Sequence, residues 1–84
     1  MKTIKELITT NPLTSSMLNS LIDLTIERLD LPINVYNDSK DDNYNYYDEL
    51  YQYLLYNVIE YGEVLTHLGI NNTNDLIEFH ELVN

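Results

Sequence analysis

The sequence contains no cysteine and no tryptophan, only two glycines and two prolines, and only four Lys and Arg residues. Without cysteine the chain can form no disulfide, no thiolate metal site and no cysteine nucleophile. The four basic residues are Lys2, Lys5, Arg28 and Lys40, and they stand against 14 Asp and Glu residues, which gives a formal net charge of −10. They are too few and too scattered to line a groove for phosphates. This excludes direct binding to nucleic acid and to an anionic membrane surface.

A long hydrophobic run is also missing. No window approaches the roughly 20 apolar residues of a membrane span, and residues 1–8 lack the continuous apolar region of a signal peptide. Together with the lack of cysteine, this predicts a cytoplasmic protein, located in the bacterial host cytoplasm if a phage encodes it. The 84 residues suffice for a single acidic helical domain, 1–84, but hardly for a deep catalytic cleft. Hydrophobic residues make up 44%, too many for a disordered chain.

Apolar residues recur at spacings of three and four in four segments, which predicts helices. The first covers about residues 3–9, and the second covers about 12–29, after the start signal Asn11-Pro12. The third covers about 46–68, and the last begins at Asn72 or Thr73 and ends near Leu82. Residues 32–36 alternate apolar and polar side chains and are expected to form a short extended linker. The predicted fold is an all-α, single-domain bundle of three to four helices.

The two longest segments have apolar faces that we expect to be buried. In the second segment this stripe consists of Leu13, Met17, Leu21, Leu24 and Leu29, widened by Leu18, Ile22 and Ile26. In the third segment it consists of Tyr47, Leu50, Leu54, Val58, Tyr61 and Leu65. Gly62 is expected to kink the third helix, and Gly69 suits the left-handed residue that closes it.

No pattern of catalytic or metal-binding residues stands out. Segment 41–45 (Asp-Asp-Asn-Tyr-Asn) resembles the start of an EF-hand calcium loop, but Tyr46 stands where a glycine is required and Gln52 where a bidentate Glu is expected. The only imidazoles, His67 and His80, lack the His-Glu-x-x-His spacing of a zinc site, and no serine sits in a glycine elbow. We therefore expect no enzyme, no cofactor and no metal.

Tyrosine is the residue type in excess. Seven of the eight tyrosines lie between residues 44 and 61, where they cannot all face one core. Tyrosine is enriched at protein interfaces, because its ring gives a large contact area at low entropy cost. With the leucine-rich face inward, the opposite side of the third helix carries Tyr46, Glu49, Tyr53, Tyr56 and Glu60. The alternative is that tyrosine fills space at the edge of a small core.

The negative charge favours a partner of opposite sign. Large basic surfaces in a bacterial cytoplasm are mostly sites that bind nucleic acid, and a field of this sign steers association with them. The lack of alanine, with eleven Asn and eight Tyr, indicates an AT-rich genome such as that of a low-GC bacterium or its phage. In size and charge the chain resembles the small acidic phage proteins that mimic DNA and block restriction enzymes, CRISPR nucleases or uracil-DNA glycosylases. No motif identifies any one of these families.

We therefore predict a small acidic inhibitor of the anti-CRISPR or anti-restriction type, carried by a phage or mobile element. It would occupy a basic site on a nucleic-acid-binding protein. The alternative is an acidic helical adaptor or regulatory subunit that binds a protein partner through an apolar and tyrosine-rich surface, and such a surface would also suit a homodimer. The residues expected to contact the partner are the carboxylates and phenols Asp38, Asp41, Asp42, Tyr46, Asp48, Glu49, Tyr53, Tyr56 and Glu60.

Overall fold

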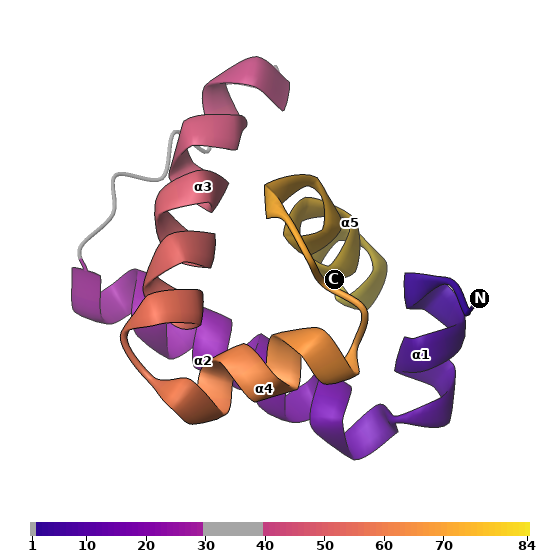
Figure 1. Cartoon of the computed structure of the whole chain (residues 1–84). Coiled ribbons are helices and arrows are strands. Elements are labelled where there is room, and N and C mark those ends of the chain that lie inside the picture. Colours follow the sequence, from indigo (N-terminus) through magenta and orange to yellow (C-terminus); the bar gives the residue numbers. More distant parts are fainter. Residues whose placement is uncertain (1, 30–39) are drawn as a thin grey trace.

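The computed structural model describes residues 2–29 and 40–84, with side chains from residue 46 onward in the second stretch. These residues form five helices, which confirms the all-α class and adds one helix to the predicted number (Figure 1). The predicted linker 32–36 lies outside the described residues, as does Asp38. The helices are α1 (Ile4–Thr10), α2 (Pro12–Leu29), α3 (Lys40–Tyr56), α4 (Ile59–His67) and α5 (Thr73–Val83).

Helices α1 and α2 begin where the sequence predicted. Thr3 caps α1, because its hydroxyl accepts a hydrogen bond from the Glu6 backbone N–H at 3.2 Å. Asn11 lies between the two helices and serves both of them. Its carbonyl accepts from the Ser15 N–H at 3.0 Å, while its side-chain amide donates to the Leu7 carbonyl at 2.9 Å. The backbone therefore turns from α1 into α2 with no further residue between them.

The single helix predicted over 46–68 is in fact two helices. Helix α3 begins earlier, at Lys40, and ends at Tyr56, and α4 begins at Ile59 after Val58, whose backbone is extended at φ −137° and ψ 118°. The break falls at Asn57 and Val58, not at Gly62, where a kink was expected. The Asn57 N–H donates to the Tyr53 carbonyl as in a regular helix, and the Asn57 side-chain amide donates to the same carbonyl, a local side-chain bond of the kind that competes with continuation of a helix.

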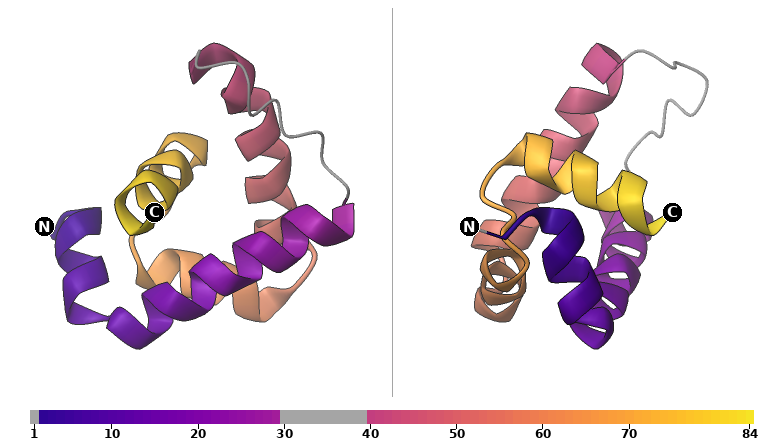
Figure 2. Two further views of the ribbon diagram at one scale, coloured as in Figure 1. Left: turned by 180° about the vertical axis from the view of Figure 1, so that it is seen from behind. Right: turned by 90° about the vertical axis from the view of Figure 1, so that its right-hand side faces the viewer.

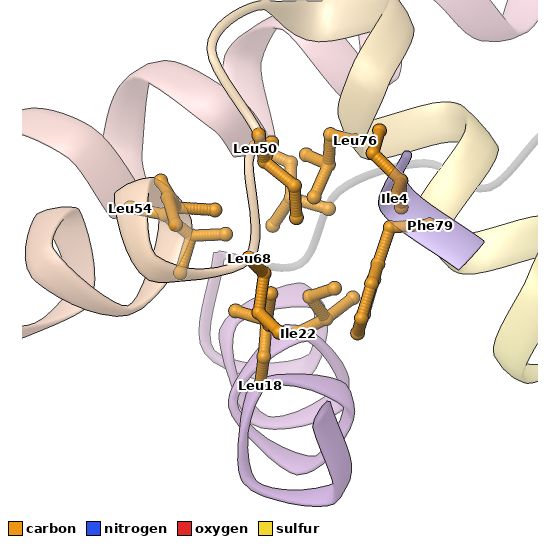
Figure 3. Packing of buried hydrophobic residues seen from close by; sticks show 10 residues of the cluster. Ile4, Leu18, Ile22, Leu50, Leu54, Leu68, Leu76 and Phe79 are labelled. Atoms are coloured by element: carbon orange, nitrogen blue, oxygen red, sulfur yellow. The ribbon is translucent and has the colours of Figure 1, made fainter. Parts of the chain in front are cut away.

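Ten buried apolar side chains form one core, to which all five helices and the turn after α4 contribute (Figure 3). Helix α2 contacts each of the other four helices. Figure 2 shows α3 and α4 on one side of the molecule, α1 and α2 on the other, and α5 crossing between them. The core residues are Ile4, Leu18, Ile22, Leu50, Leu54, Leu65, Leu68, Ile70, Leu76 and Phe79.

The buried face of α2 differs from the predicted stripe. Three residues of that stripe, Leu13, Met17 and Leu24, are 85%, 48% and 61% exposed. The helix instead turns a narrower face inward, on which two small hydroxyl residues flank the apolar pair. Their hydroxyls donate to the carbonyls four residues earlier, so neither is left without a partner, and their small size allows neighbouring helices to approach closely. The buried residues of α2 are Ser15, Leu18, Ile22 and Thr25.

Candidate protein-binding surface

Charge is distributed very unevenly along the chain. All four Lys and Arg residues lie at or before Lys40, whereas residues 41–84 contain nine of the 14 Asp and Glu residues and no Lys or Arg. Residues 41–84 therefore carry −9 of the net charge of −10. These residues build nearly all of α3, together with α4 and α5. The first two helices are close to neutral, so the anionic field arises from one part of the fold.

Three of the predicted contact residues are exposed on this acidic part. Glu49 on α3 and Glu60 on α4 are exposed, and Tyr56 at the end of α3 is 78% exposed. Glu49 and Tyr56 are seven residues apart, which places them on one face about 10 Å apart along the helix. Asp41 and Asp42 belong to the first turn of α3, but their side chains lie outside the described residues.

Asp48 is half-buried and bonded within the chain. Its two carboxylate oxygens accept hydrogen bonds from the Thr73 hydroxyl at 2.8 Å and from the Gln52 side-chain amide at 3.0 Å. Thr73 is buried and is the first residue of α5. Asp48 therefore ties α3 to the start of α5, and its replacement would leave a buried hydroxyl without its partner. We give it a role in the fold and leave it out of the binding experiments below.

Tyr46 and Tyr53, the other two tyrosines of the predicted surface, are less exposed than expected. Tyr46 is half-buried, and within the described part of the chain its hydroxyl is buried without a hydrogen-bond partner. Burial, and then the charges of Tyr47 and Asp23, raise the pKa of the Tyr46 phenol to about 12. Because this hydroxyl is buried, the expectation that Tyr46 lies on the outer side was wrong. Tyr53 is also half-buried.

A hydrogen bond that the sequence did not indicate joins α3 to α5. The Tyr47 hydroxyl lies 2.6 Å from Nδ1 of His80, and the two rings meet edge to face at 5.6 Å between centroids. Burial raises the pKa of the Tyr47 phenol, and burial lowers the pKa of His80 despite the opposing charges of Asp23 and Glu81. Both shifts favour a protonated phenol that donates to a neutral imidazole.

This pair gives the fold a pH dependence near neutrality. Because the pKa of His80 is lower in the folded chain than its ordinary 6.5, the unfolded chain binds the proton first as the pH falls below 6.5. The free energy of unfolding is therefore expected to be highest above that pH and to decrease as the pH falls through the folded-state pKa. Urea unfolding of wild type and His80→Asn at about pH 7.5 and pH 5.5 measures the effect.

The decrease between the two pH values should be smaller in His80→Asn than in wild type, because the variant lacks the titrating group. His67→Asn is the matched control, since His67 is exposed and its ring makes an exposed hydrogen bond to the Asn11 side chain, with Nε2 3.0 Å from Oδ1. An equal decrease in wild type and His80→Asn would contradict the assignment.

A hollow of about 380 Å³ lies between the end of α2 and the junction of α3 with α4. Its wall combines apolar and aromatic side chains with one acidic and one basic residue. The hollow explains why Tyr53 is only half-buried, since its side chain forms part of the wall. The lining residues are Leu24, Thr25, Glu27, Arg28, Tyr53, Val58 and Tyr61.

None of the family models, curated proteins or solved structures compared with the chain matches it. No helix among the described residues combines the length and the apolar character needed to cross a membrane. Among the side chains that the structure describes, in residues 2–29 and 46–84, no three of His, Asp or Glu gather as ligands of a metal ion.

Proposed function

We propose that the protein is a small acidic binding protein that occupies a basic, nucleic-acid-binding site on another protein. The supporting observation is the segregation of charge, with nine carboxylates and no Lys or Arg in residues 41–84. Carboxylates on helices take up positions that phosphates would otherwise fill, and their field speeds association with a basic partner. Inhibition of a restriction enzyme, a CRISPR nuclease or another DNA-processing protein of a phage host is the setting that suits this chemistry.

Glu49, Tyr56 and Glu60 are the residues that support this function best. Two carboxylates supply charge, and the Tyr56 ring, which contributes little to the core at 78% exposure, supplies apolar contact. A tyrosine beside charged residues is a typical binding anchor, because its ring loses water while its hydroxyl can still bond.

The test begins with capture of partners from a nuclease-treated bacterial lysate at about 50 mM salt, followed by measurement of the dissociation constant of each retained protein. The constant is expected to rise about tenfold or more between about 50 and 200 mM salt, because exposed charge pairs are screened. Duplex DNA should compete for the same site. An adaptor that binds through apolar surface would show neither effect.

Matched double variants distinguish the effect of the acidic surface on binding from the effect of the overall net charge. Glu49→Gln/Glu60→Gln is expected to weaken binding by about three- to tenfold, since each exposed pair is worth up to about 1 kcal/mol. The control Glu6→Gln/Glu27→Gln changes the net charge equally at exposed positions of α1 and α2 and should leave binding nearly unchanged. Equal loss in the two variants, or retained partners that resist salt and DNA, would contradict the proposal.

A further inference from the structure

From Leu13 to Leu24 the outward face of α2 is apolar and uncharged, and the charged pair Glu27 and Arg28 follows in the last turn. Successive residues of a helix turn by about 100°, so Leu13, Met17, Ser20 and Leu24 share the side directly opposite the buried Leu18 and Ile22. All four are exposed, Leu13 to 85% and Leu24 to 61%. Residues 7–22 include no charged side chain, the longest such stretch in a chain of net charge −10. On this surface another acidic chain meets the least electrostatic repulsion.

The two ends of this face complement each other. Leu13 protrudes near the start of α2, and the hollow of about 380 Å³ opens beside Leu24 near its end. The eleven residue steps from Leu13 to Leu24 span about 16 Å along the helix. At the middle, the long Met17 and the small Ser20 lie nearly symmetrically about the midpoint of that span.

We propose that two copies of the chain pair through α2, antiparallel and related by a two-fold axis. Leu13 of each copy then enters the hollow of the other, against Leu24 and Tyr53. Met17 of each copy packs beside Ser20 of the other, a large side chain against a small one. A two-fold interface requires that residue i meets j while j meets i, and a protrusion and a hollow at opposite ends of one helix meet this requirement.

The matching protrusion and hollow on one helix favour a second copy as the occupant. Two chains of −10 repel each other, and they meet most easily along α2, where residues 7–22 carry no charge and the single carboxylate in the hollow, Glu27, stands beside Arg28. A basic partner would gain nothing from such a face. An 18-residue helix is about 27 Å long, and one face of it is small compared with the roughly 800 Å² that each partner buries in a standard interface. The dimer is therefore expected to be weak and to form only as the protein concentration rises. The pairing uses Tyr53 and the junction of α3 with α4, but Glu49, Tyr56 and Glu60 do not line the hollow, and the pairing does not rest on the proposed function.

Sedimentation equilibrium from about 10 µM to 1 mM tests the pairing. The wild-type mass should rise with concentration from 9.9 kDa toward twice that value. Leu13→Glu should remain monomeric while its circular dichroism and melting temperature match wild type, because an 85% exposed side chain adds little to the folded monomer. Leu82→Glu is the matched control, since it adds the same charge at an exposed leucine of α5 and should still dimerise. A monomeric wild type over this range, or equal association of both variants, overturns the proposal.

Single cysteines in this cysteine-free chain test the orientation. In the antiparallel pair the two copies of residue 20 lie next to the axis, within the roughly 4.4–6.8 Å Cα separation of a disulfide. Ser20→Cys should therefore form a covalent dimer on mild oxidation. The two copies of Leu13 lie about 16 Å apart, so Leu13→Cys should crosslink poorly although it is the more exposed position. The reverse result overturns the antiparallel arrangement.

Discussion

Replacement of Phe79 by alanine is expected to lower the free energy of unfolding by about 3–5 kcal/mol. Phe79 is fully buried on α5, and its ring lies between Ile4 of α1 and Ile22 of α2 (Figure 3). No other phenylalanine exists in the chain, so this ring is the largest fully buried apolar side chain. Its removal leaves a cavity where three helices meet, and a domain of 84 residues has only about 4–12 kcal/mol of stability in total.

Urea unfolding followed by far-ultraviolet circular dichroism measures the loss, because the chain lacks tryptophan as a fluorescent probe. Two controls bracket the result. Phe79→Leu keeps most of the volume and should cost about 1–1.5 kcal/mol. Leu82→Ala alters a 45% exposed residue of the same helix and should cost less than about 1 kcal/mol. A cost for Phe79→Ala no larger than that for Leu82→Ala would show that α5 does not pack as described.

The starts of α1, α2 and α5 were predicted well, because they depend on side chains close in sequence, whereas the start of α3 at Lys40 and the break before α4 were not predicted. Asn72 caps α5 through a bond from the Asp75 N–H to its side-chain oxygen at 2.8 Å, and Gly69 ends the preceding turn with a left-handed φ of 74°. The start of α2 at Pro12 followed the same local logic. Each of these signals works within about five residues.

The buried face of α2 could not be predicted, because it depends on the shape of the neighbouring helices. Spacing identified apolar residues on two sides of this helix, and the choice between them requires knowing what packs against it. The expected stripe extended from Leu13 and Met17 across to Leu18 and Ile22, but only the Leu18 and Ile22 side is buried, together with the small Ser15 and Thr25. An apolar residue on a helix is therefore weak evidence of burial in so small a domain.

The candidate site was predicted in part. Glu60 is exposed as expected although it lies on the separate helix α4, and exposure of Glu49 and Tyr56 followed from the position of the leucines on α3. The inward turn of Tyr46 and the bond of Asp48 to Thr73 did not, because both depend on contacts with α2 and α5 that are distant in sequence. The hydrogen bond between Tyr47 and His80 was not predicted either, because these residues are 33 positions apart in the sequence. The roles in binding remain predictions that the salt and variant experiments decide.

Gly69→Ala is expected to lower the free energy of unfolding by about 2–5 kcal/mol, from two separate causes. The φ of 74° lies in the left-handed region, which costs an alanine about 1–2 kcal/mol. A Cβ at this position would also lie 2.8 Å from Cδ1 of Leu7, and overpacking costs about 1–3 kcal/mol. This conformation closes α4, because the Gly69 N–H bonds to the Thr66 carbonyl and the Ile70 N–H to the Leu65 carbonyl.

A double-mutant cycle with Leu7→Ala separates the two causes. Shortening Leu7 removes the contact but not the backbone strain, so the cost of Gly69→Ala should fall to about 1–2 kcal/mol in the Leu7→Ala background. Gly62→Ala is the matched control inside α4, where the nearest atom to a new Cβ is the Leu55 carbonyl oxygen at 3.4 Å. It should change stability by no more than about 1 kcal/mol, and toward greater stability. If Gly69→Ala behaved like Gly62→Ala, the left-handed turn between α4 and α5 would have to be abandoned, and with it the placement of Ile70 in the core.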